Sequence, residues 1–158
     1  MTGLIATVLP DDDAIPPAII VNDGWFPDVD PAMFKEQQRI RDNVTPSRMR
    51  EALISAILAV RSDLRAWAAG HRSAGSARLE AVQADRIDNT SELILLYHRA
   101  IFTRAKAEVV ERYRDVDLTK DGERKAEDLD ITVGELRRDS IHAIRDMLGV
   151  TRTTVELI

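Results

Sequence analysis

The sequence predicts an all-α protein: a small helical bundle with two long antiparallel C-terminal helices, an extended N-terminal arm and a short β-prone C-terminal tail. Apolar residues recur every three or four positions through most of the chain, which is the period of a helix that buries one face. Two dipeptides, Asp30-Pro31 and Thr45-Pro46, combine an N-cap residue with a first-turn proline, as helix starts do. A length of 158 residues suits one domain.

The chain divides into an extended arm over residues 1–30, a helical bundle domain over 31–149 and a tail over 150–158. Pro16-Pro17 and Asn22-Asp23-Gly24 oppose regular structure in the arm, but its apolar content is too high for a free linker. The arm therefore either packs along its own domain or docks on a neighbouring chain. The residues expected at a subunit or partner interface are apolar: Ile19, Ile20, Trp25, Phe26, Val155, Leu157 and Ile158.

Two helices are expected in the first half of the bundle. The first begins at Asp30 and ends at Asn43, with Met33, Phe34 and Ile40 on its apolar face. The second begins at Thr45 and is stopped by Gly70. Its core-facing stripe consists of Met49, Leu53, Ala56, Ile57, Val60, Leu64 and Trp67.

Residues 69–90 are expected to form a short hairpin or an extended loop, because glycine, serine and turn-forming residues are concentrated there. Asn89, with Glu92 three positions later, then predicts a capping-box start for the next helix. Its predicted apolar face consists of Leu93, Leu96, Tyr97, Ala100, Thr103, Ala107, Val110 and Tyr113.

The last helix is expected to end at Gly149, a usual C-terminal cap residue. Thr132 and Glu135 predict a second capping box, so this helix is expected to break near Asp130. Its predicted apolar face consists of Ala126, Leu129, Val133, Leu136, Ile141, Ile144 and Leu148.

The composition argues against several classes of protein. The absence of cysteine excludes a disulfide framework and thiol catalysis, and fits a reducing compartment. A net charge of -5 argues against a molecule that binds nucleic acid over its whole surface. No lysine or arginine occurs in residues 1–10, and the apolar stretch 52–60 is about half the ~20 residues that a bilayer requires. We expect a soluble, cytoplasmic product with no membrane contact.

No catalytic or metal-binding set emerges from the residues. The histidines, His71, His98 and His142, are scattered and include no pair at helical zinc-ligand spacing. Asp117 to Asp128 follows the register of a calcium loop, but Thr119 and the short Asp128 replace preferred ligands, so we interpret this segment as a helix–helix turn. The sequence predicts no enzyme, no cofactor and no metal.

One basic cluster surrounds the joint between the first two predicted helices. If its side chains share a surface, they can contact DNA phosphates without reading bases, although some could instead pair with local acids. These candidate DNA-phosphate contacts are Arg39, Arg41, Arg48 and Arg50.

The tail 153–158 is β-prone and ends in Val-Glu-Leu-Ile. We expect it to be bound by its own domain or by a neighbouring chain through strand addition.

Several motifs resemble one known family, the head completion (stabilisation) protein, or gene product L, of contractile-tailed bacteriophages. The likeness covers about residues 25–158, and 69–90 carries little of it. The motifs are Trp25 to Asp30, the 45–67 helix, Glu111 to Asp115, Asp117-x-Thr119, Ala126 to Leu129, Arg137 to Asp139, Ala143 to Asp146 and Thr153 to Ile158.

The resemblance implies a non-enzymatic virion protein that serves as a head–tail connector. It implies binding below the portal protein after DNA packaging, a homo-oligomeric ring, twelvefold to match the portal, and a seat for the next neck or tail component. It also implies proximity to packaged DNA, and assembly in the host cytoplasm. The competing interpretation is a host-type helical protein-binding or regulatory module that stays monomeric or dimeric.

Overall fold

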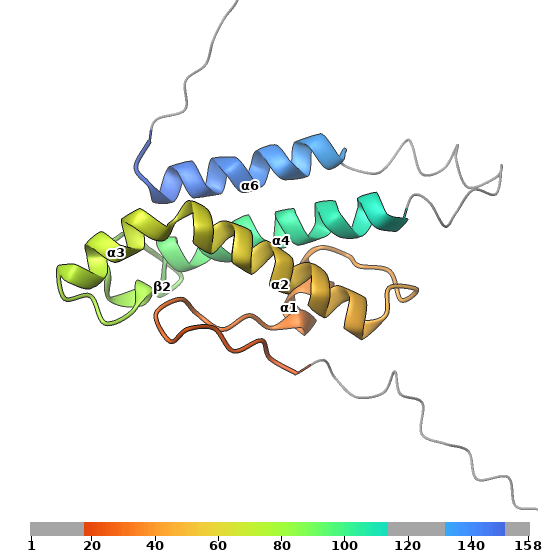
Figure 1. The fold of residues 1–158 in the computed structure, drawn as a ribbon, viewed down its shortest axis with the longest axis horizontal. Helices are drawn as coiled ribbons and strands as arrows, with labels where there is room; N and C mark the ends of the chain where they lie inside the picture. Colours follow the sequence, from red (N-terminus) through yellow and green to blue (C-terminus); the bar gives the residue numbers. More distant parts are fainter. Residues whose placement is uncertain (1–17, 114–131, 151–158) are drawn as a thin grey trace, which may run out of the picture.

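A computed structural model describes residues 18–113 and 132–150 of the chain (Figure 1). This part is mostly helical, as predicted, and it also contains a small two-stranded antiparallel sheet, which is the hairpin that was one of two expectations for residues 69–90. In chain order the elements are α1 (Pro31–Gln37), α2 (Pro46–Asp63), α3 (Arg65–Ser73), the 3-10 turn η2 (Leu79–Ala81), β1 (Arg86–Ile87), β2 (Thr90–Ser91), α4 (Glu92–Tyr113) and α6 (Val133–Met147).

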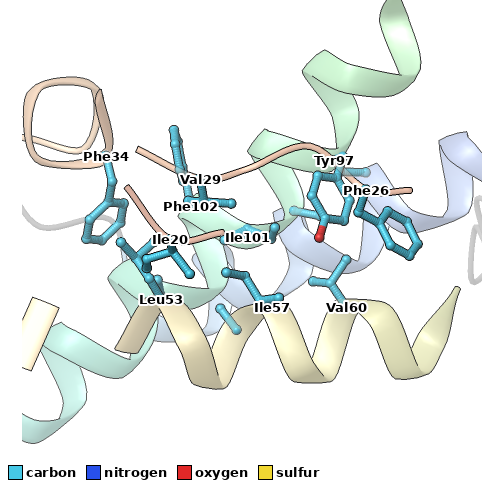
Figure 2. Packing of buried hydrophobic residues seen from close by; sticks show 14 of the residues in the cluster. Ile20, Phe26, Val29, Phe34, Leu53, Ile57, Val60, Tyr97, Ile101 and Phe102 are labelled. Carbon is cyan, nitrogen blue, oxygen red and sulfur yellow. The ribbon is translucent and has the colours of Figure 1, made fainter. Parts of the chain in front are cut away.

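The helix α4 lies at the centre of the described part. It packs against α2 and against α6, and the Phe102 ring lies 5.5 Å from the Phe34 ring of α1. Because neighbours approach α4 from several directions, its buried side chains extend beyond the single predicted face to Ile101, Phe102 and Val109. Figure 2 shows Tyr97, Ile101 and Phe102 among the core residues of α2 and the N-terminal segment.

Three predicted helix starts are confirmed by their hydrogen bonds. The Asp30 carboxylate accepts a 2.8 Å hydrogen bond from the Ala32 N–H, and Thr45 Oγ1 accepts one of 3.4 Å from the Arg48 N–H. At α6 the capping box is complete, because the Thr132 side chain accepts from the Glu135 N–H and the Glu135 carboxylate accepts from the Thr132 N–H. Side-chain oxygens thus satisfy N–H groups that a helix start leaves free.

Several predicted boundaries are wrong. The first helix ends at Gln37 instead of Asn43, and Arg39 adopts a left-handed φ of 50° that a helix cannot continue through. Gly70 lies inside α3, and the chain leaves this helix near Gly75, whose φ is +96°. Leu64, which was expected within one continuous helix, separates α2 from α3.

The region 69–90 contains the predicted hairpin, but only at its end. Arg86 pairs with Ser91 and Ile87 with Thr90. Asp88 and Asn89 form the two-residue turn with φ values of 50° and 60°, which is the backbone that tight hairpins favour. Asn89 is therefore a turn residue and not the N-cap of α4, which begins at Glu92.

The C-terminal helices are confirmed only in part. The helix α6 lies alongside α4 and ends as predicted, because Gly149 has a φ of +67° and the Val150 N–H bonds to the Arg145 carbonyl at 3.0 Å. Two long antiparallel helices remain a prediction, since residues 114–131 and the 117–128 turn lie outside the described residues. Within residues 18–113 and 132–150, no helix is long and apolar enough to cross a bilayer.

Candidate functional site

The N-terminal segment, residues 18–29, is built into the core of its own chain. Ile20 and Val29 exchange two backbone hydrogen bonds of 2.8 and 3.0 Å, which closes the segment into a narrow antiparallel loop. The Phe26 ring stacks on the Tyr97 ring of α4 with centroids 4.8 Å apart, and Figure 2 shows both beside Val60 of α2. Of the two arrangements left open by the sequence, residues 18–29 adopt packing along their own domain.

The predicted interface residues therefore differ in their accessibility. Ile20, Trp25 and Phe26 are core residues, with 6%, 6% and 4% of their surfaces exposed. Ile19, by contrast, is 56% exposed and faces solvent. The remaining three, Val155, Leu157 and Ile158, lie outside the described residues. Among the predicted interface residues of the segment, Ile19 is therefore the one that can still contact a neighbouring subunit.

The Asp23 carboxylate holds the tip of the segment in place. It accepts hydrogen bonds from the N–H groups of Trp25 (3.1 Å) and Phe26 (3.0 Å), and it pairs with Arg61 (3.0 Å) and Arg72 (2.7 Å). Burial raises the pKa of Asp23, but the Phe26, Arg72 and Trp25 hydrogen bonds and the Arg61 charge together lower it more, so its pKa lies below the ordinary value. Asp23 is therefore ionised at neutral pH.

Asn22 links the same tip to α4. Its Nδ2 donates to the Tyr97 hydroxyl at 2.8 Å and to the Pro27 carbonyl at 3.1 Å, and its Oδ1 accepts from Arg61 at 3.2 Å. Burial of Tyr97 raises the pKa of its hydroxyl far above the ordinary value, despite the opposing Asn22 bond and Arg61 charge. From the sequence, Asn22-Asp23-Gly24 was interpreted only as a turn. The missed signal was the pair of arginines, Arg61 on α2 and Arg72 on α3, that contact it.

An apolar surface remains exposed where α2 runs beside the segment. Arg50 donates to the Ala18 carbonyl at 2.8 Å and Arg61 to Asn22 at 3.2 Å, so the segment follows α2 from one arginine to the other. Between these arginines, Ile54 and Leu58 lie on the same side of α2. The exposed apolar side chains of the segment and of this side of α2 are together called the apolar patch: Ile19, Val21, Ile54 and Leu58, which are 56%, 78%, 40% and 63% exposed.

The predicted basic cluster lies around the α1–α2 joint. Arg39, Arg41 and Arg48 are exposed, whereas Arg50 is half-buried against the segment. Lys106 of α4 adds a further cation near this joint by donating to the Gln38 carbonyl at 2.8 Å. The DNA-phosphate role of these arginines stays a prediction.

The histidines serve separate contacts. His71 packs edge-on against Trp67 at 4.5 Å, and His98 stacks on Phe102 at 5.6 Å. Burial lowers the pKa of His98, and the Asp28 backbone hydrogen bond opposes this only in part. Across the two described ranges, no group of His, Asp and Glu side chains is arranged to hold a metal ion.

The comparisons with known proteins identify a family of phage structural proteins. The family model described as phage head completion protein (GPL) matches residues 20–158. The chain belongs to the phage head completion protein (GPL) family. The resemblance inferred from the sequence motifs is therefore confirmed, and the match begins at Ile20, where the segment pairs with Val29.

Two curated relatives support this assignment. The head completion/stabilization protein of Escherichia phage P2 is 37% identical over 140 residues, which cover 89% of this chain and 83% of the relative. The probable head completion/stabilization protein of Haemophilus phage HP1 (strain HP1c1) is 27% identical over 142 residues, covering 89% and 92%. No solved structure matches this head completion protein. Neither relative carries the name of an enzyme, and no catalytic family is indicated.

Proposed function

We propose that this head completion protein is a head–tail connector of the virion. It binds below the portal protein after DNA packaging, stabilises the filled head and seats the next neck or tail component. The family match over residues 20–158 carries this proposal, because it includes both the folded core and the tail. A protein of this kind acts through its surfaces, and the apolar patch is a surface that a folded monomer leaves open to water.

The proposed assembly is a homo-oligomeric ring, twelvefold to match the portal. Ring contacts are heterologous, so each subunit must offer two different surfaces that complement each other. The apolar patch supplies one such surface, and the tail 150–158 is the candidate for the other. The proposed bundle domain, residues 31–149, ends in two long antiparallel helices, of which α4 and α6 are the described parts.

Electron microscopy of the tail-attachment vertex of full heads, with and without this protein, tests the proposal directly. We expect ring-shaped density below the portal that disappears when the protein is omitted. An unchanged vertex would refute the connector role. A chain that stays monomeric or dimeric and absent from heads would instead fit a host-type binding module.

Contact with packaged DNA is a separate part of the proposal. Arg39, Arg41 and Arg48 are exposed around the α1–α2 joint, and each phosphate that a cation neutralises adds to the salt dependence of binding. Replacing all three with glutamine is expected to abolish weak, sequence-independent DNA binding at low salt, measured by fluorescence anisotropy. Equal binding by the triple variant and the unmodified protein would exclude these arginines as phosphate contacts.

A further inference from the structure

We propose that the apolar patch is the acceptor site for the tail of a second copy of this chain. Residues Val155 to Ile158 of one subunit add as a short strand to residues 18–21 of its neighbour. The inference rests on the proposed homo-oligomer, and it assigns the two surfaces that meet at each subunit contact.

The backbone of the segment offers an open strand edge at the patch. Ile20 uses both its N–H and its C=O to pair with Val29, so the backbone groups of Ile19 and Val21 point to the opposite edge. Within residues 18–113 and 132–150, no hydrogen bond uses the backbone N–H or C=O of Ile19 or Val21. Exposed edges of this kind accept an added strand.

The length of this edge matches an apolar run of the tail. Pro16 and Pro17 precede it and have no N–H to donate, and the Asn22-Asp23-Gly24 turn follows it. The open edge therefore runs along residues 18–21, and Ile19 and Val21 supply its unused backbone groups. The Val155-Glu156-Leu157-Ile158 run has the same length, and its valine and leucine share one face when extended. On that face they would cover the exposed side chains of Ile19 and Val21.

Charge also favours this occupant. Arg50 lies at one end of the patch, and its guanidinium donates to the Ala18 carbonyl. No carboxylate among the described residues pairs with it. Glu156 is the single charged residue in the Val155–Ile158 run, so the added strand would bring a carboxylate to this arginine.

The distance that the connecting residues can span indicates that the tail binds a neighbouring chain and not its own. Figure 1 shows α6 and the N-terminal segment on opposite sides of α2 and α4. Packed helix axes lie roughly 8–10 Å apart, and the path from α6 to the segment crosses two such layers. The five steps from Val150 to Val155 span at most about 18 Å when fully extended. The helix α6 also ends at the opposite end of the bundle from the start of α2, where Arg50 contacts the segment, so the tail would have to cover this distance as well (Figure 1). A chain's own tail is therefore too short to place Val155 to Ile158 on its own patch.

A disulfide test uses the absence of native cysteine. Phage heads are assembled with V21C/L157C protein and oxidised, and the chains are separated on a non-reducing gel. We expect dimers and higher multimers that collapse to monomer on reduction. The matched control is I87C/L157C, since Ile87 is also apolar and 63% exposed but lies in β1, outside the patch; it should stay monomeric.

Three outcomes would overturn the inference: only monomer from V21C/L157C, an internal disulfide that gives a faster monomer band, or equal multimers from the control. If unmodified protein is absent from full heads, the proposed connector function fails instead. If it is present but V21C/L157C gives no multimers, only the tail contact fails.

A charge exchange provides a second measurement that does not depend on disulfide geometry. R50E alone and E156R alone are each expected to lower incorporation into heads at least several-fold. The double variant R50E/E156R restores it, because the pair is re-formed with reversed signs. Single variants that incorporate normally, or a double variant that is no better than either single one, would contradict the proposed contact.

Discussion

Removing the Asp23 carboxylate tests the account of how the N-terminal segment is anchored. In D23A, the N–H groups of Trp25 and Phe26 lose their acceptor, and each loss costs about 1 kcal/mol in this partly buried position. The Arg61 and Arg72 side chains are 37% and 45% exposed, so their lost ion pairs cost only about 0.5 kcal/mol each after solvent screening. The expected loss in the free energy of unfolding is about 3 kcal/mol.

D23N separates the two contributions. An asparagine oxygen can still accept from both backbone N–H groups, so this variant loses only the ion pairs and is expected to cost about 1 kcal/mol. The assay is urea-induced unfolding at pH 7, followed by circular dichroism. D42N is the matched control, because its carboxylate pairs with Lys35 at 2.8 Å but is 95% exposed; no measurable change is expected.

Equal losses for D23A and D23N would refute the assignment of most of the stabilisation to the two backbone hydrogen bonds. A loss below about 0.5 kcal/mol for D23A would refute the claim that Asp23 anchors the N-terminal segment. The pH dependence gives an independent check. Because the folded-state pKa of Asp23 is lowered from 3.8, its stabilisation is complete above that pH and disappears as the pH falls through the folded-state value.

Three further predictions follow from individual contacts. Y97F removes the hydroxyl that accepts from Asn22 at 2.8 Å, and is expected to lower the free energy of unfolding in urea by about 1 kcal/mol. This loss is smaller than that of D23A because Asn22 keeps its bond to the Pro27 carbonyl. A larger loss than that of D23A would contradict this order. Because burial lowers the pKa of His98, the unfolded state takes up its proton first, so the free energy of unfolding should fall as the pH drops below about 6.5. H98F should flatten that slope between pH 8 and 5.5, and an unchanged slope in H98F would exclude His98 as its source. T132A removes the N-cap of α6 and is expected to lower the free energy of unfolding by about 1 kcal/mol, whereas T132S should be nearly neutral; equal losses for both would show that the hydroxyl does not cap the helix.

Local signals in the sequence predicted three of the four expected helix starts, and the Asn89 start was wrong. Asp30, Thr45 and Thr132 each need only residues within three positions to form their caps, and all three caps are present. Helix ends were predicted less well. Gly70 was expected to stop a helix but lies inside α3, because the cost of an internal glycine, about 1 kcal/mol, is small enough for packing to offset.

The anchor and the apolar patch could not be predicted from local pattern. Asp23 meets Arg61 and Arg72 only because α2 and α3 carry those residues past the tip of the segment, 38 and 49 positions away. Ile54 and Leu58 lie outside the predicted core-facing stripe of α2. Whether a neighbouring element covers them depends on tertiary packing, which the sequence does not specify. The family, in contrast, could be recognised from sequence motifs, because a motif is a local order of residues and can be identified without knowing its three-dimensional contacts.

The packing of α6 has a mechanical consequence. Among the described residues, α6 packs chiefly on α4, fixed by its buried face and by the Ser140 hydroxyl bond to the Ala100 carbonyl at 2.8 Å. A tension applied at Val150 is therefore borne by a single helix–helix contact and is not spread over the whole core. Force transmitted through the tail would peel α6 from α4 before it disturbed α2 or the anchored N-terminal segment.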